Sequence, residues 1–389
     1  MSIIVPLPAA DGRLAPYTLS DAAHFPDRIT RPLNRVALAA AHVVADPHAD
    51  IDPWLQAAPD WERTIAYREY LWDLGLGVAE AMDTAQRGMG LDWPMALELI
   101  RRSVAASRGR EGAVVFSGAG TDHLDAAGTY TVDDVIRAYE EQIAAIEAVG
   151  GRIILMASRA LVRAARSADD YARVYQRVLS QVRQPVIIHW LGDMFDPALA
   201  GYWGTKDLGT AMDTAVAIIN ASAAKVDGVK ISLLDKDREI AMRRRLDKTV
   251  KMYTGDDFNY AELIAGDEHG YSHALLGIFD AIAPAAAASL AALAGGDLVK
   301  FHAILAPTVP LSRHIFRAPT RFYKTGVVFM AWLNGHQDHF TMVGGQESAR
   351  STLHLAELFR LADKAGLFRD PERAAARMKA VLAVHGVAP

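Results

Sequence analysis

The sequence predicts an α/β fold in which eight strands alternate with helices and close into a (β/α)8 barrel, with an N-terminal arm and a C-terminal helical extension. Short apolar, β-branched runs alternate with segments of helical periodicity, which is typical of a parallel α/β fold. Eight such units indicate a closed barrel rather than an open sheet. Neither a GxGxxG motif nor a P-loop motif follows the first strand. Their absence argues against a nucleotide-binding sheet.

Four strand–helix units are predicted in the first half of the chain. Apolar runs predict strands at 36–44, 75–81, 113–117 and 152–158. A helix with clear amphipathic spacing is predicted at 61–74. Residues with N-capping chemistry mark the starts of the next three helices: Asp92, the pair Thr131 and Asp134, and the pair Ser167 and Asp170. The last two pairs have the spacing of capping boxes.

The second half of the chain supplies the other four units. Strands are predicted at 185–190, 226–233 and 251–254, and the eighth strand with its helix at 270–284. A segment of unusual length, residues 191–209, follows the fifth strand, and loops of this length are often functional lids. We therefore divide the chain into an N-terminal arm, a barrel and a C-terminal helical subdomain at residues 1–33, 34–295 and 296–389.

Lys230 is the most informative residue of the predicted strands. It lies between Val229 and Ile231, so period-two alternation puts it on the opposite face from these two side chains. In a parallel barrel that face is either the barrel centre or the helix layer. Burial lowers the pKa of an amine, and a neutral amine can attack a carbonyl carbon. The alternative is a structural lysine paired with a carboxylate such as Asp83.

Composition limits the classes of function. The chain has no cysteine, which excludes disulfides and thiolate chemistry and predicts a cytoplasmic protein. The net charge of −5 and the lack of a basic run with interleaved aromatics argue against a nucleic-acid partner. No signal peptide and no uninterrupted apolar stretch long enough for a membrane span is found. The expected partner is a small molecule.

Several of these segments together resemble the dihydrodipicolinate synthase / N-acetylneuraminate lyase superfamily of class I aldolases. GVKIS at 228–232 resembles the strand that carries the Schiff-base lysine of that family, and YTGDD at 253–257 resembles the segment that follows it. PVIIHW at 185–190 resembles the fifth strand, and 318–335 resembles the C-terminal helical region. The resemblance implies a TIM barrel, an imine formed by Lys230, no cofactor, and a homo-oligomer.

Two positions depart from the pattern of that superfamily. His189 stands where the fifth strand normally carries a proton-relaying tyrosine, and Met82-Asp83-Thr84-Ala85 replaces the Gly-Thr-Thr-Gly loop that binds the carboxylate of a 2-oxo acid. A carboxylate at Asp83 would repel such a substrate. The chain therefore resembles a divergent branch, acting on a small oxo acid or a sugar-derived carbonyl compound.

Catalytic groups of such barrels lie at the carboxyl ends of the strands. We predict that Lys230 and His189 are catalytic in a lyase or aldolase reaction. The residues expected to bind substrate are Asp83, Thr84, Asp122, His123, Arg159 and Asp256. Structural roles compete with these functions: His189 as a core histidine, Asp256 as a helix cap, and Arg159 as a surface ion-pair partner.

Two other functions stay open at this point. Carboxylates and imidazoles at the barrel mouth could bind a divalent metal such as Zn, Mn or Mg. The candidate ligands are His42, Glu80, Asp83, Asp122 and His123, although no fixed metal-binding spacing supports them. The protein would then be an isomerase or hydrolase acting on a sugar-like substrate. The other alternative is a barrel that binds a small molecule without catalysis.

Overall fold

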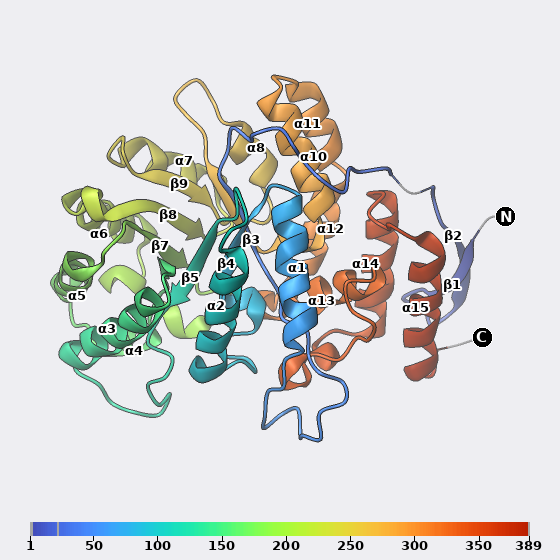
Figure 1. The fold of residues 1–389 in the computed structure, drawn as a ribbon, viewed down its shortest axis with the longest axis horizontal. Helices are drawn as coiled ribbons and strands as arrows, with labels where there is room; N and C mark the ends of the chain where they lie inside the picture. The colour runs from blue at the N-terminus through green and yellow to red at the C-terminus, as the bar shows by residue number, and fades with distance from the viewer. Residues whose placement is uncertain (1–2, 22, 388–389) are drawn as a thin grey trace.

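A computed structural model describes residues 3–21 and 23–387 and contains a closed barrel of eight parallel strands (Figure 1). The order around the barrel is β10-β3-β4-β5-β6-β7-β8-β9. The strands are β3 (Ala37–Ala40), β4 (Gly77–Glu80), β5 (Val115–Ala119), β6 (Arg152–Leu155), β7 (Val186–Leu191), β8 (Val226–Ser232), β9 (Lys251–Thr254) and β10 (His273–Leu276). The predicted barrel is confirmed.

Helices surround the barrel. They are α1 (Trp61–Asp73), α2 (Trp93–Ser107), α3 (Val132–Ala148), α4 (Arg159–Ala164), α5 (Ala168–Gln181), α6 (Leu208–Ala221), α7 (Lys236–Arg245), α8 (Tyr260–Ala265), α9 (Ile278–Ala281) and α10 (Ala283–Ala294). The Asp92 cap and the Thr131–Asp134 capping box form as predicted. The second capping box was wrong: the Ser167 side chain caps nothing, and Asp170 instead accepts from the backbone N–H of Arg166.

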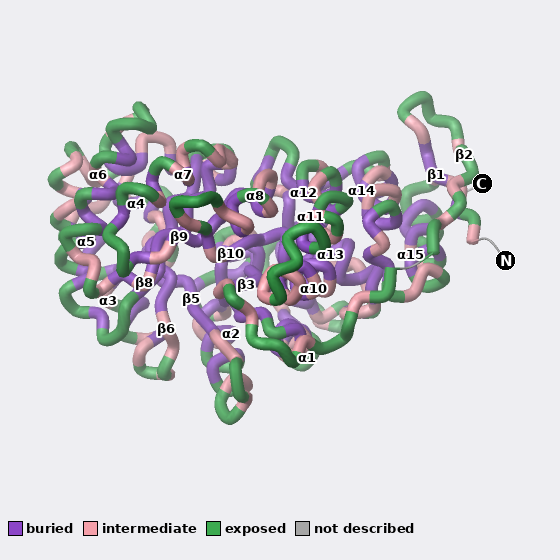
Figure 2. The backbone as a smooth tube through the Cα atoms, turned by 90° about the horizontal axis from the view of Figure 1, so that it is seen from above, coloured by how far each residue is buried: buried purple, intermediate pink, exposed green. Residues whose placement is uncertain are grey.

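The two faces of each strand pack against different cores. Leu38, Ala79, Phe116, Ile187 and Leu275 belong to one buried cluster that fills the barrel centre. The residues next to them in the sequence pack against the helix layer in the larger core. This alternation decides which polar side chains of a strand can reach the interior. Figure 2 shows that the strands are buried along most of their length.

The C-terminal part of the chain forms a helical unit beside the barrel. Its helices are α11 (Leu298–Leu305), α12 (Thr308–Ile315), α13 (Tyr323–Leu333), α14 (Thr352–Lys364) and α15 (Pro371–Val384). Every residue of α13 is buried, and α13 contacts α9, α14 and α15. It therefore joins the barrel to the C-terminal helices and brings its N-terminal residues to the barrel.

Near the N-terminus, β1 (Ile4–Pro8) and β2 (Leu14–Thr18) form a hairpin, which the sequence did not predict. It lies against α14 and α15, at the end of the molecule away from the barrel (Figure 1). The Tyr17 hydroxyl donates to Asp363 Oδ2 at 2.7 Å, and Arg360 donates to the Pro8 carbonyl at 3.0 Å. These contacts place the hairpin on the C-terminal helices rather than over the barrel mouth.

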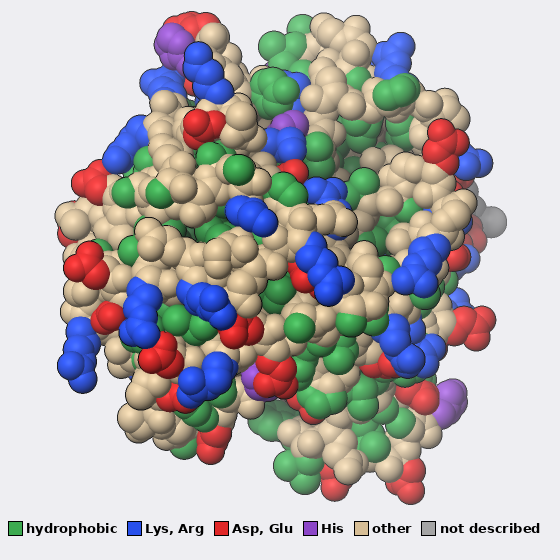
Figure 3. All heavy atoms as spheres, turned by 60° about the vertical axis from the view of Figure 1, so that its left-hand side comes forward, with side chains coloured by type: hydrophobic (Ala, Val, Ile, Leu, Met, Phe, Trp, Pro, Cys, Tyr) green, Lys and Arg blue, Asp and Glu red, His purple; other side chains and the backbone are tan. Residues whose placement is uncertain are grey.

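The surface in Figure 3 carries interspersed basic and acidic side chains, without a broad basic area on that face. No helix among the described residues is long and apolar enough to cross a membrane.

Glu239 is an acid buried inside the fold. It lies on α7 and accepts a hydrogen bond of 2.6 Å from Ser272, while its Oε2 has no partner among the described residues. Burial raises its pKa to about 8. A glutamate in the unfolded chain titrates near pH 4.3. The folded state therefore holds this proton more tightly, and the stabilisation present below pH 4.3 is lost as the pH rises through about 8.

Glu239→Gln is expected to remove this pH dependence. Between pH 6 and pH 9 the free energy of unfolding of the native protein should fall by about 2–3 kcal/mol more than that of the variant, since unfolding releases the Glu239 proton over most of this window. Urea unfolding at both pH values measures it. Glu268→Gln, at an exposed position, is the control and should behave like the native protein. Equal losses in the variant and the native protein would contradict the expectation.

Candidate active site

Lys230 points into the barrel. Its neighbours on β8, Val229 and Ile231, pack in the outer core, so Lys230 and Ser232 occupy the inner face. The Lys230 side chain lines a small cavity of about 10 Å³, roughly the space of one water molecule. The cavity is lined by Ala40, Met82, Asp83, Thr84, Leu191, Phe195, Lys230, Ser232, Asp257, Gly277, Phe316 and Tyr323. Within the described part of the chain, Lys230 Nζ has neither a hydrogen bond nor an ion pair.

Gly255 leaves the space that the Lys230 side chain occupies. A Cβ at Gly255 would lie 2.8 Å from Lys230 Cε and closer still to Ser232 Oγ. Such contacts essentially never occur without displacement of a neighbour. The glycine of the YTGDD segment is therefore required for steric reasons, because it leaves room for the long Lys230 side chain in the barrel centre.

Burial and two nearby carboxylates set the pKa of Lys230. Burial lowers its pKa, and Asp257 and Asp83 partly offset that effect. The Asp257 side chain is itself buried, which raises its pKa to about 7, while hydrogen bonding from Ile278 and the charge of Lys230 oppose the rise. An amine that loses its proton readily therefore lies near a carboxyl group that can exchange one at neutral pH.

Thr84 and Tyr323 form a hydroxyl pair on another wall of the cavity. Their oxygens share a hydrogen bond of 2.8 Å. The Tyr323 ring stacks on Phe316 with 4.4 Å between centroids and meets Phe195 edge-on. Burial raises the pKa of Tyr323 well above its usual value, so the phenol keeps its proton and can donate it in a hydrogen bond.

His189 pairs with Lys230 across the β7–β8 ladder. Its Nε2 is hydrogen-bonded to Ser232 Oγ at 3.2 Å, and its buried Nδ1 has no partner within the described residues. Burial, followed by the charge of Lys230, lowers its pKa well below 6.5. The imidazole is therefore neutral at pH 7, and its Nδ1 has no hydrogen-bond partner within the described residues.

A larger cleft of about 660 Å³ adjoins this cavity at the carboxyl ends of β4 to β7. Asp83 and Leu191 line both spaces. Five predicted residues meet in the cleft wall, namely Asp83, Asp122, His123, Arg159 and His189. We call the cavity around Lys230 the inner cavity and this space the outer cleft.

Charged groups of the outer cleft are largely paired with one another. Arg87 holds Asp122 through two hydrogen bonds of 2.9 and 2.7 Å. Burial alone would raise the pKa of Asp122, but Arg87 and Gln142 outweigh it and the pKa is lowered. Gln142 also donates to His123 Nδ1 at 2.8 Å. Arg159 is paired with Asp196 at 2.5 Å and is half exposed.

Asp256 and Asp257 differ in placement. Asp256 accepts from the backbone N–H groups of Phe258 and Asn259 at 2.8 and 3.0 Å and caps the turn after β9. Asp257 rather than Asp256 lines the inner cavity.

Residues 5–387 match the family described as Protein of unknown function (DUF993). The chain belongs to this family. None of the curated protein sequences compared with it matches.

Solved structures share the fold of this DUF993 chain at low sequence identity. The prophage protein YagE of E. coli, of the dihydrodipicolinic acid synthase family and in complex with pyruvate, has a TM-score of 0.66 and 15% identity over 86% of this chain and 100% of its own. The chloride-inhibited dihydrodipicolinate synthase of Acinetobacter baumannii, complexed with pyruvate, has a TM-score of 0.60 and 16% identity over 86% of this chain and 99% of its own. The Aquifex aeolicus dihydrodipicolinate synthase has a TM-score of 0.59 and 15% identity over 91% of this chain and 98% of its own. The resemblance is confirmed at the level of the fold.

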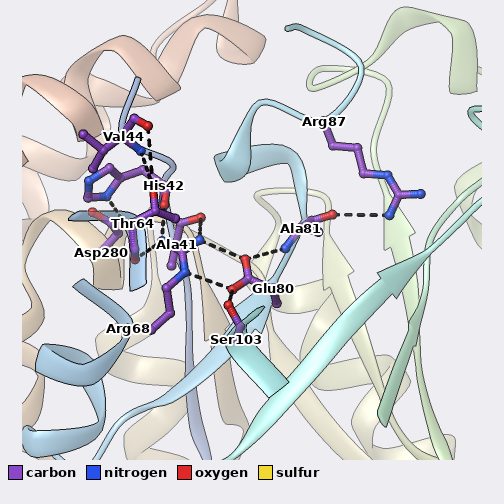
Figure 4. A network of polar contacts seen from close by, with 10 residues as sticks. All are labelled: Ala41, His42, Val44, Thr64, Arg68, Glu80, Ala81, Arg87, Ser103 and Asp280. Atoms are coloured by element: carbon purple, nitrogen blue, oxygen red, sulfur yellow. Dashed lines mark hydrogen bonds and ion pairs between the residues drawn. The ribbon is translucent and has the colours of Figure 1, made fainter. Parts of the chain in front are cut away.

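His42 and Glu80 of the DUF993 chain lie in a buried network of polar contacts (Figure 4). Neither residue lines the inner cavity or the outer cleft. Glu80 follows the outward-facing Val78 in the alternation of β4 and accepts from Arg68 at 2.8 and 2.9 Å. His42 Nδ1 is bonded to Asp280 Oδ2 at 2.8 Å. The five candidate metal ligands are thus divided between this network and the outer cleft. In residues 3–21 and 23–387, no three His, Asp or Glu side chains are grouped to hold a metal ion.

Lys324 is a second buried lysine near the site. Burial lowers its pKa to about 8, and Asp83 and Asp196 oppose the shift. Its Nζ donates to the Arg321 carbonyl at 3.0 Å, and it does not line the inner cavity. Lys230 is therefore the better candidate nucleophile.

Three polar residues of the inner cavity were not among the predicted site residues. Ser232 follows Lys230 by two positions, so alternation alone could have placed it. Asp257 stands next to the predicted Asp256, and the choice between neighbours depends on the turn. Tyr323 comes from a helix more than 90 residues after β8, and no local signal connects the two.

Proposed function

We propose that the protein is a class I lyase or aldolase that forms an imine between Lys230 and a small oxo acid or sugar-derived carbonyl compound. The observation that supports this most is the Lys230 amine inside the barrel, unpaired among the described residues, with its pKa lowered by burial. A buried amine with a readily lost proton is what imine formation requires.

The neutral amine attacks the carbonyl carbon, and the π electron pair moves to the oxygen, which takes a proton. Loss of water from this carbinolamine gives a protonated imine. That imine accepts the electron pair of the carbon–carbon bond that breaks, while the proton of a hydroxyl on the departing carbon passes to a base. The resulting enamine is protonated on carbon, and water releases the product and the amine.

In this proposal His189 moves the proton, together with Ser232 and Asp257. Its neutral imidazole fits the base of the cleavage step. Asp83 and Thr84 contact the substrate in the inner cavity. The part of the substrate that extends outward meets Asp122, His123 and Arg159. Asp256 acts by fixing the turn that carries Asp257.

Reductive trapping tests the proposal. The protein is incubated with cyanoborohydride and a panel of oxo acids and hydroxylated ketones, and intact mass is measured. An imine is reduced by hydride to a stable secondary amine, so a covalent mass gain equal to the reduced adduct is expected with at least one compound. Lys248→Ala, which removes an exposed lysine, should trap as the native protein does. A native protein that gains no mass with any compound would overturn the proposal.

A further inference from the structure

The groups that surround Lys230 carry a distinct pattern of charge. Asp83 and Asp257 are acidic, and Thr84, Ser232 and Tyr323 bear hydroxyls. Among the described residues that line the inner cavity, Lys230 is the one cation. A carboxylate on the reacting carbon would enter a small, water-poor space beside two acidic groups and without a guanidinium to receive it. Like charges at such short range and low dielectric repel strongly.

The same groups suit hydroxyls. Asp83 makes no side-chain hydrogen bond within the described residues and is partly exposed, where the inner cavity joins the outer cleft. Asp257 Oδ1 accepts from Ile278 N at 2.9 Å, which leaves Oδ2 as an acceptor. The Thr84–Tyr323 pair offers a further donor and acceptor. A substrate hydroxyl could donate a hydrogen bond to Asp83 or to Asp257 Oδ2, whereas an ionised carboxylate has no hydrogen to donate to either acid.

Space divides the substrate between two regions. The inner cavity holds about 10 Å³, whereas the outer cleft holds about 660 Å³, within the usual range for small-molecule sites. Only the carbonyl carbon and its immediate substituents can lie at Lys230. The remainder passes Asp83 and Leu191 into the outer cleft.

We propose that the substrate is a hydroxylated aldehyde or ketone, with hydroxyl-bearing carbon rather than a carboxylate next to the carbonyl. This inference rests on the imine chemistry proposed above. It assigns Asp83 the role of selecting the substrate: its carboxylate accepts a hydroxyl of the correct compound and repels the carboxylate of a 2-oxo acid.

Competitive trapping with pyruvate and dihydroxyacetone tests this assignment. Both probes react with the same amine, so the ratio of their trapping rates cancels any change in the reactivity of Lys230. The native protein should trap dihydroxyacetone faster than pyruvate. Asp83→Asn should raise the pyruvate-to-dihydroxyacetone ratio about tenfold, because it removes one negative charge near the reacting carbon.

Two variants serve as controls. Asp83→Glu keeps the charge and should keep the native ratio to within about twofold, well short of the tenfold charge effect. Asp193→Asn makes the same chemical change at an exposed position and should leave the ratio unchanged. Faster trapping of pyruvate by the native protein, or an unchanged ratio in Asp83→Asn, would overturn the assignment but leave the imine intact. Absence of trapping with both probes and with every other compound of the panel would overturn the proposed function itself.

Discussion

Lys230→Ala is expected to lower the turnover of any substrate that the trapping panel identifies by about a thousandfold or more, as for other covalent nucleophiles. No other described side chain places an amine in the inner cavity, so nothing replaces the electron sink. The fold should survive, because the variant removes a buried polar group whose desolvation is costly. Steady-state kinetics and far-UV circular dichroism measure the two effects.

Lys248→Ala is the matched control, since it deletes a lysine at an exposed site, and it should retain full turnover. Lys324→Ala distinguishes the roles of the two buried lysines. The thermal stability of this variant can change, but reductive trapping at Lys230 should persist. Turnover of Lys230→Ala within a few-fold of the native rate would contradict the mechanism.

Arg68→Met is expected to cost about 3–5 kcal/mol of unfolding free energy, because it strands the buried carboxylate of Glu80. Arg68 is fully buried and makes a two-point ion pair with Glu80, and it also donates to the carbonyls of Thr64 and His42 (Figure 4). The pair links α1 to β4, and Ser103 extends the link to α2. Urea unfolding measures the loss.

The control for this change is Arg101→Met, at an exposed ion pair within α2. It should cost no more than about 0.5 kcal/mol. The double variant Arg68→Met, Glu80→Met should recover part of the stability, since it removes the stranded charge. A loss below about 1 kcal/mol for Arg68→Met would show that Glu80 is accommodated without its partner.

Much of the architecture could be predicted from local patterns. Strand alternation and apolar periodicity depend on neighbouring residues, so the eight strands and most helices were found. The failures have identifiable causes. Ser167 has the spacing of a capping box, but Asp170 bonds the backbone of Arg166 instead. The N-terminal hairpin is stabilised by α14 and α15, more than 300 residues away in sequence, which no local pattern reports.

The site was harder to predict than the fold. Alternation predicts that Lys230 and Val229 lie on opposite faces of their strand. Which of the two faces points into the barrel centre depends on how β8 pairs with β7 and β9. Glu80 and Lys230 both stand on apolar strands, yet the first points to the helix layer and the second inward. Tyr323 reaches the cavity because α13 docks through its buried aromatic contacts, and such docking depends on the whole C-terminal unit.

Peptide mapping after reductive trapping tests the central claim most directly. The labelled protein is digested, and the modified residue is identified by tandem mass spectrometry. The account predicts a single adduct on the peptide that contains Lys230, with Lys324 unmodified. An adduct on Lys324, or scattered over exposed lysines in proportion to their accessibility, would contradict it.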